Sequence, residues 1–291
     1  MKKFVFALFL LSSPSYAENF AEAIKGKKEL SEEAYQILLK VEKENANDPA
    51  YWISRANHAY KQSSVVTLST GKGEGGFQLT DPETGERKGT LKEGIDPQKA
   101  DDAINSLIKA RSLAPLRIDI HEGLATLGIR LKKYDSVVSA CDTYLQQALT
   151  SKGNLTYADG TKLGDAWKSK PLQDEQSYAG QLNNIAKPES DKALEAIANL
   201  MVKHFPKNPM GHNNLALMAS IKNDQKGVLK HLADAYAVAP TDPIVTLNYA
   251  DFLLKDKQDE KAKTILQTFL KQEDIPATSK QQAEAILKKI K

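Results

Sequence analysis

The chain has 291 residues, 40 of them lysine or arginine and 37 aspartate or glutamate, which gives a formal charge of +3. Acidic and basic residues are interspersed, so the sequence lacks the basic patch of a nucleic-acid-binding or membrane-surface protein. Cys141 is the only cysteine, so no intramolecular disulfide can form and stability has to come from packing. The length is large for one globular core but normal for a stacked repeat array.

The N-terminal residues have the features of a secretion signal. Lys2 and Lys3 precede an apolar run, and residues 15–17 place small side chains where a signal peptidase cleaves. The apolar run is far shorter than the roughly 20 residues that a membrane-spanning helix needs, and no later segment is long enough. We therefore expect a signal peptide over residues 1–17 and a periplasmic or secreted chain over residues 18–291.

The last third of the sequence repeats at a fixed spacing. Aspartate or asparagine before proline is typical of a helix start, because the first side chain caps the helix and proline is tolerated at its first position. Alanines further along allow two helices to approach closely. The pairs that lie 34 residues apart are Pro206 and Pro240, Pro209 and Pro243, Asn214 and Asn248, and Ala216 and Ala250. The pattern resembles the tetratricopeptide repeat, a helix–turn–helix unit.

The same frame extends toward the N-terminus with two interruptions, since Asp48-Pro49 and Asp96-Pro97 mark further helix starts. The resemblance implies an all-α fold, a tetratricopeptide-repeat helical solenoid of about five helix pairs. A helix around residues 34–41 precedes the pairs. The remaining boundaries that we expect are insertions at residues 63–95 and 149–173 and a C-terminal capping helix at about 277–290.

Both insertions contain β-prone segments. In the first, residues 65–68 and 77–79 are separated by glycines, and a turn at residues 81–85 precedes a further strand. In the second, Asp159-Gly160 is a turn signal between two short β-prone runs, and Trp167 follows in a polar setting. The first insertion falls inside a helix pair and the second between pairs, so we expect them at opposite rims of the array.

The sequence predicts no catalytic, metal or cofactor site. The glycine-rich residues 71–76 lack the Gly-Lys-Ser/Thr sequence and the following helix of a phosphate-binding loop. His121 and His212 occupy a helix-packing position of the repeat, and Cys141 lies on a packing face as a small apolar residue. We therefore expect no enzymatic activity, no cofactor and no metal.

The resemblance implies a binding function, because tetratricopeptide arrays hold extended peptides or partner proteins in a groove lined by the first helix of each pair. Asparagine suits such a groove, since its amide both donates and accepts hydrogen bonds. The groove residues that the frame predicts are Asn57, Lys61, Glu122, Arg130, Asn183, Asn213, Asn214, Asn248 and Asp251. Phe77 and Trp167 are the predicted partner contacts in the insertions.

Two functions follow from this interpretation. The first is a non-enzymatic protein- or peptide-binding scaffold or adaptor of the bacterial cell envelope, which binds through the groove, the insertions or both. The alternative is an accessory subunit of an envelope enzyme or export complex, whose insertions contact the substrate. A fold of this kind does not by itself decide between them.

Overall fold

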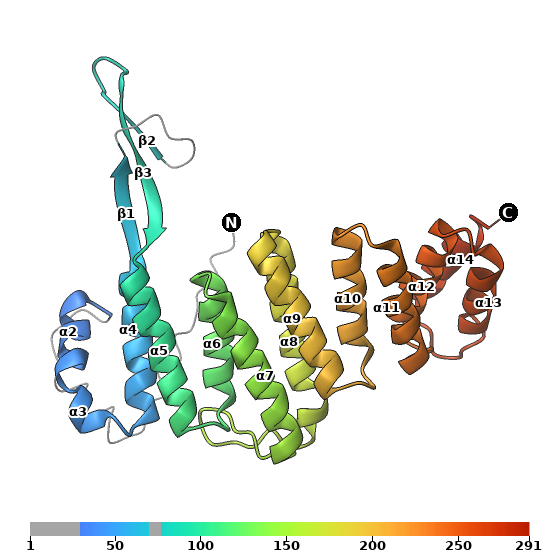
Figure 1. Cartoon of the computed structure of the whole chain (residues 1–291), viewed down its shortest axis with the longest axis horizontal. Coiled ribbons are helices and arrows are strands. Elements are labelled where there is room, and N and C mark those ends of the chain that lie inside the picture. Colours follow the sequence, from blue (N-terminus) through green and yellow to red (C-terminus); the bar gives the residue numbers. More distant parts are fainter. Residues whose placement is uncertain (1–29, 70–76, 291) are drawn as a thin grey trace. The chain divides into compact units, whose positions relative to one another are not determined.

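The computed structural model describes residues 30–69 and 77–290, so the predicted signal peptide lies outside the described residues. The fold is all-α, a tetratricopeptide-type helical solenoid that carries one three-stranded sheet (Figure 1). The chain divides into two compact units, which we describe separately. Unit 1 comprises Met1–Ser136 and Asn154–Gly164, and unit 2 comprises Val137–Gly153 and Asp165–Lys291.

The central element of unit 1 is a helix pair whose two members lie on either side of the first insertion in the sequence. Helix α4 packs against α5, although the sheet separates them in sequence, and α5 packs against α6. The leading helix α2 packs on α4, and the short α3 follows it. The bounds of these helices are α2 (Glu32–Lys40), α3 (Glu42–Asn45), α4 (Pro49–Ser63), α5 (Pro97–Leu113) and α6 (Ile118–Arg130).

The proline dipeptides begin helices as the sequence predicts. At each of the four, the residue before proline has an extended backbone, and its side chain accepts a hydrogen bond from a free N–H of the first turn. Proline occupies the first helical position, where its missing N–H costs no helical hydrogen bond. The four capping residues are Asp48, Asp96, Asn208 and Asp242.

Charged side chains tie the leading helices of unit 1 to the first pair. Arg55 on α4 donates to Asp102 on α5, with an Nη2–Oδ1 distance of 2.6 Å, and also pairs with Glu42. The hydroxyl of Tyr35 on α2 donates to the same aspartate at 2.6 Å, and burial and this hydrogen bond raise the pKa of Tyr35. The Arg55 guanidinium also lies 5.3 Å from the ring centroid of Trp52. Each group of this network therefore has a partner, as partly buried charges require.

The first insertion forms a three-stranded antiparallel sheet in the order β1-β3-β2. Its strands are β1 (Ser64–Ser69), β2 (Phe77–Thr80) and β3 (Arg87–Ile95). The predicted turn joins β2 to β3, and Gly85 has a φ of +71°, a left-handed conformation that glycine adopts without strain. The sheet continues the helix pair without a linker, because β1 directly follows α4 and Asp96 caps α5 directly after β3.

The second insertion lies at the other end of α5. Residues 155–163 form a small hairpin closed by the predicted turn, in which Tyr157 N–H donates to the Thr161 carbonyl at 2.8 Å. Thr156 bonds to the chain between α5 and α6, accepting from Ile118 N–H and donating to the Leu116 carbonyl, both at 2.9 Å. The two insertions of unit 1 therefore emerge at opposite ends of α5, as the repeat frame predicts.

Unit 2 contains three further helix pairs, α8 with α9, α10 with α11, and α12 with α13, among the residues that the structure describes. Helix α14 packs on α12 and α13 and covers the end of the core, as expected of a cap. None of the described helices is long and apolar enough to cross a membrane. The bounds are α7 (Tyr134–Ser151), η1 (Gly164–Lys168), α8 (Lys170–Ile185), α9 (Pro188–His204), α10 (Pro209–Ile221), α11 (Gln225–Val238), α12 (Pro243–Lys255), α13 (Asp259–Phe269) and α14 (Ala277–Leu287).

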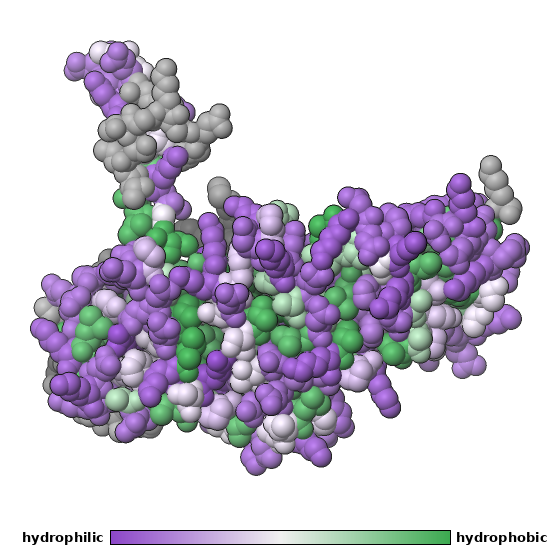
Figure 2. Space-filling model, viewed as in Figure 1, coloured by the Kyte–Doolittle hydropathy of each residue, from purple (hydrophilic) through white to green (hydrophobic). Residues whose placement is uncertain are grey.

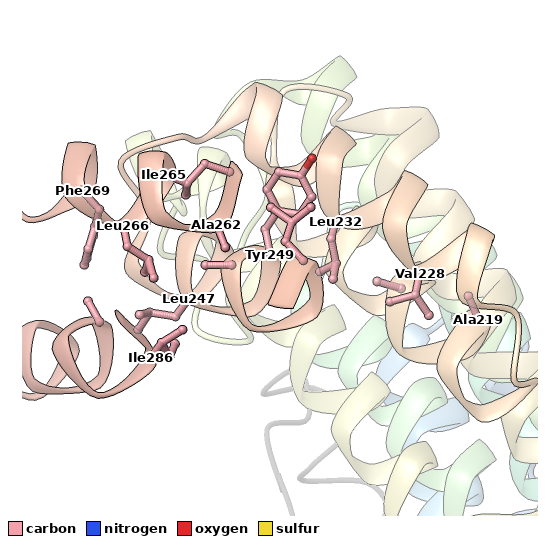
Figure 3. Close-up of a cluster of buried hydrophobic side chains, with 14 residues drawn as sticks. Ala219, Val228, Leu232, Leu247, Tyr249, Ala262, Ile265, Leu266, Phe269 and Ile286 are labelled. Atoms are coloured by element: carbon pink, nitrogen blue, oxygen red, sulfur yellow. The ribbon is translucent and has the colours of Figure 1, made fainter. Parts of the chain in front are cut away.

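A hydrophobic cluster runs through the last pairs of unit 2 (Figure 3). Ala216 and Ala250, the small residues of the 34-residue repeat, are both buried in it, which confirms their expected place at close helix contacts. Two helix backbones approach closely at Gly211 on α10. A Cβ atom there would lie 2.9 Å from the Val202 backbone nitrogen and 3.0 Å from the Ala198 carbonyl oxygen of α9. Only glycine therefore fits at this position.

We predict that Gly211→Ala destabilises the chain by about 1–3 kcal/mol, because the added methyl group has to push α9 and α10 apart. Gly180→Ala is the matched control, since a Cβ at this exposed position of α8 meets nothing within 4 Å. The control should be neutral or stabilising, as alanine favours a helix over glycine. Urea unfolding of both variants measures the difference. A Gly211→Ala variant as stable as the wild type would show that α9 and α10 are not this close.

Candidate functional site

A cleft lies where the sheet of unit 1 joins the helices. Its volume is about 660 Å³, and it is formed by the base of β1 and β3, the start of α5 and the turn after α6. Figure 2 shows a hydrophobic area at the same place, where the strands meet the helices. The lining residues are Ser64, Val65, Val66, Glu93, Gly94, Ile95, Pro97, Ala100, Leu131, Lys132 and Lys133.

Two apolar side chains of this cleft are unusually accessible. Val66 is 65% exposed and Ile95 is 38% exposed, although both are β-branched residues of a kind that normally pack. On the helical side, Lys133 forms an ion pair with Asp101 at 2.5 Å. Lys132 is exposed, and among the described residues no ion pair engages it. The cleft therefore offers apolar contacts beside two exposed charges of opposite sign, Lys132 and Glu93.

The cleft also borders a free strand edge. In an antiparallel pair, backbone groups point alternately toward the partner strand and away from it. The hydrogen bond from Asp96 N–H to the Ser63 carbonyl, at 2.7 Å, sets this alternation at the base of the sheet. The N–H and C=O groups of Glu93 and Ile95 therefore point away from β1. Strand β2 occupies that side only as far as Leu91, so within the described residues these groups have no strand beside them.

The predicted groove residues of unit 1 lie on α4 and α6. Asn57 and Glu122 are half-buried, while Lys61 and Arg130 are exposed. The guanidinium of Arg130 donates to the hydroxyl of Tyr60 at 3.1 Å, which links the two helices. Their predicted role in binding stays a prediction.

The predicted groove residues of unit 2 differ in accessibility. Asn248 is exposed, Asn183 and Asn213 are half-buried, and half-buried Asp251 forms an ion pair with Lys255 at 2.7 Å. Asn214 is the exception, because it is buried.

Asn214 uses its amide inside the chain and does not present it to a groove. The side chain is 5% exposed and exchanges two hydrogen bonds with Gln176 on α8, at 3.0 and 3.2 Å. It also donates to the sulfur of Met201 at 3.7 Å. The repeat frame correctly placed Asn214 on the first helix of its pair. The partner on α8 could not be inferred from that frame, since it depends on how successive pairs stack.

The two residues predicted in the insertions belong to different units. Phe77 begins β2, where its backbone pairs with Leu91 of β3. Trp167 lies in the short helix η1, which falls mostly in unit 2, and its side chain is half-buried. Trp167 is not among the described residues that line the cleft at the base of the sheet. Their roles in binding stay predictions.

A cluster of two histidines and an aspartate lies in unit 2. His212 on α10 meets His231 and Asp234 on α11, and one ligand-type atom of each lies within 4.8 Å of the others. The Nδ1 atoms of both histidines are buried and have no hydrogen-bond partner among the described residues. Burial, followed by the charge of Lys230, lowers the pKa of His231, so this ring is neutral near pH 7.

The sequence analysis missed this cluster. It placed His212 correctly on a helix and assigned it to packing, but it did not connect the residue with α11. The available signal was the spacing of His231 and Asp234, since residues three apart share one face of a helix. The register of α10 against α11 was needed to complete the set.

A second buried titratable group lies between α7 and α8. The Glu175 side chain is fully buried, and neither carboxyl oxygen has a hydrogen bond of good geometry among the described residues. Burial, with a smaller effect of the charge on Asp174, raises the pKa of Glu175 to about 8 against an opposing contribution from the Cys141 thiol. Burial and the nearby Glu175 raise the pKa of Cys141 as well, which fits its expected role as a core residue and not as a nucleophile.

No protein-family model matches the chain, and no curated protein matches its sequence. Solved structures with similar helix arrangements include an assembly chaperone of RpL4, with a TM-score of 0.37 and 10% identity over 95% of this chain and 96% of that one. A tetratricopeptide repeat protein from Parabacteroides merdae gives a TM-score of 0.33 and 12% identity, covering 95% and 92% of the two chains.

The TPR2AB domain of yeast Sti1, in a complex described as containing pHSP90, gives a TM-score of 0.31 and 13% identity. The match covers 96% of this chain and 99% of that one. At TM-scores this low the matches carry no argument about function. The assignment of the fold rests on the helix pairs, the caps and the buried alanines described above.

We predict that Glu175→Gln raises stability at neutral pH. The native state keeps the proton up to a pKa of about 8, whereas the unfolded chain releases it near the ordinary value of 4.5. Between these values the unfolded state binds fewer protons, so the free energy of unfolding falls as pH rises. Glutamine mimics the neutral acid and should add about 3 kcal/mol at pH 7.

Urea unfolding from pH 4 to pH 8 measures this effect. The free energy of unfolding of the wild type should fall over this range, and that of the variant should fall much less. Glu284→Gln, at an exposed position of α14, is the matched control and should leave the pH dependence unchanged. An unchanged pH dependence in Glu175→Gln would mean that the carboxyl group is not held neutral in the native state.

Proposed function

We propose that this protein is a non-enzymatic binding scaffold of the bacterial cell envelope, which takes an extended segment of a partner protein into the cleft at the base of its sheet. The observation that carries the proposal is the edge of β3 at Glu93 and Ile95, which borders the cleft and which no strand covers within residues 30–69 and 77–290. An extended segment that adds to such an edge gains affinity from backbone hydrogen bonds.

The composition of the cleft suits a segment of this kind. Specificity in strand addition comes from pockets that receive alternate side chains of the added segment. The exposed apolar surface of Val66 and Ile95 favours an apolar residue of the ligand. The exposed Lys132 and Glu93 favour charged residues of opposite sign to their own. A short segment with both residue types is therefore the expected ligand.

The cell-envelope location rests on the N-terminal sequence. Its basic start, apolar run and small residues at 15 and 17 are the features of a cleavable signal. The near-neutral charge of the remaining chain fits a protein partner better than a nucleic acid.

We predict that Glu93→Pro weakens peptide binding at least ~10-fold, because proline removes an outward N–H and places its ring in the path of the added strand. The hydrogen bonds between β1 and β3 should survive, since the Glu93 N–H does not face β1. The probes are extended peptides selected from a random display library against the purified chain. Affinity is measured by fluorescence anisotropy, and amide exchange at Glu93 and Ile95 should slow in the complex.

Glu93→Ala is the matched control, because it removes the same side chain but keeps the outward N–H. Binding should be affected less in this variant than in Glu93→Pro. Equal affinity of Glu93→Pro and the wild type would rule out strand addition at β3. Failure to select any peptide would favour the alternative function, an accessory subunit of an envelope enzyme or export complex.

A separate prediction concerns export. Expression of the full sequence in a Gram-negative host should give a periplasmic protein that begins at Glu18, as N-terminal sequencing would show. Ala17→Leu should block cleavage, because the peptidase requires a small residue at that position. Recovery of the intact N-terminus from the cytoplasm would contradict the proposed location.

A further inference from the structure

We propose that His212, His231 and Asp234 form a binding site for a divalent transition-metal ion, with zinc as the cation that best suits the three ligands. The site lies within unit 2 between α10 and α11, and its occupancy does not depend on the function proposed for the cleft in unit 1.

The helix pair brings the three side chains together. His231 and Asp234 are three residues apart and share one face of α11, and α11 packs against α10, which carries His212. One ligand-type atom of each residue lies within 4.8 Å of the others. A tetrahedral zinc site needs ligand atoms about 3.4 Å apart, so binding requires these side chains to close by roughly 1 Å.

The two imidazoles are also unsatisfied at one nitrogen each. No hydrogen bond among the described residues engages either imidazole, and both Nδ1 atoms have less than 1 Å² of accessible surface. Asp234 is half-buried and forms no ion pair with a described lysine or arginine. Buried polar atoms without partners are rare in folded proteins, because each costs about 1–3 kcal/mol. A bound cation would give the imidazoles and the carboxylate a common partner.

The chemistry of the ligands selects the class of metal. Imidazole nitrogen suits zinc, copper and nickel, whereas calcium and magnesium prefer oxygen ligands alone. Two imidazoles and one carboxylate leave one tetrahedral position unfilled by this chain. Water or a ligand atom from another molecule can take that position, so the site can join α10 to α11 and still bind a further group.

The test is zinc titration of the untagged chain after treatment with a chelator. Isothermal titration calorimetry should show one equivalent bound, and the thermal midpoint should rise because the ion binds the folded state. Cobalt is a second probe, since its visible absorption bands distinguish four-coordinate from six-coordinate binding. His231→Gln and His212→Gln should each abolish the stoichiometric event, and Asp234→Asn should weaken it at least ~10-fold.

His204→Gln is the matched control. This histidine belongs to the same unit but bonds to Asp142 at 2.6 Å and lies outside the cluster, so its replacement should leave zinc binding unchanged. The proposal is overturned if the wild type binds no zinc, if His231→Gln and Asp234→Asn bind as tightly as the wild type, or if only His204→Gln loses the ion. Circular dichroism of each variant separates loss of the site from loss of the fold.

Discussion

The junction between the first helix pair and the sheet is the constraint on which the arrangement of unit 1 depends. Helix α4 passes into β1, and β3 passes into the cap of α5, without an intervening linker. The hydrogen bond between Asp96 and Ser63 closes this junction, and the packing of α4 on α5 fixes the spacing of the strands that leave it. The sheet is thus an extension of the helix pair and not a loop attached to it.

This constraint explains why the cleft lies where it does. The phase of the β1–β3 ladder is set at the junction, and this phase decides which backbone groups of β3 point outward. The ion pair of Arg55 with Asp102 supports the same arrangement within the helix pair, because it holds α4 against α5. In the part of the chain that the structure describes, strand β2 pairs with β3 only as far as Leu91. No described strand therefore covers the outward groups of Glu93 and Ile95 next to the turn after α6.

Local signals made most of the fold predictable. Asp-Pro and Asn-Pro dipeptides begin helices for reasons confined to one helical turn, and the 34-residue spacing of Ala216 and Ala250 reflects the contact within one helix pair. The turn at Gly85 and the sheet likewise follow from short-range propensity. These features need no knowledge of how one pair packs on the next.

The candidate sites were harder to predict, because each depends on contacts between elements. Asn214 fits a groove in the repeat frame, but Gln176 from α8 engages its amide, so the side chain is buried. The cleft requires the turn after α6 to approach the base of the sheet. The histidine cluster requires the register of α10 on α11, which places His212 beside His231. A period in the sequence gives the position along each helix but not this register.

Whether a buried polar group has a partner separates structural from functional candidates. In unit 1, Arg55, Asp102 and Tyr35 satisfy one another, so the network is explained by the stability it gives to the leading helices. In unit 2, Glu175 and the histidine cluster lack such partners. The carboxyl group of Glu175 relieves its burial by keeping a proton, which is why its pKa rises. The histidine cluster differs in geometry, because it brings one ligand-type atom from each of three side chains within 4.8 Å of the others. A cation can be shared by three such atoms, and this difference makes the cluster, and not Glu175, the candidate for binding.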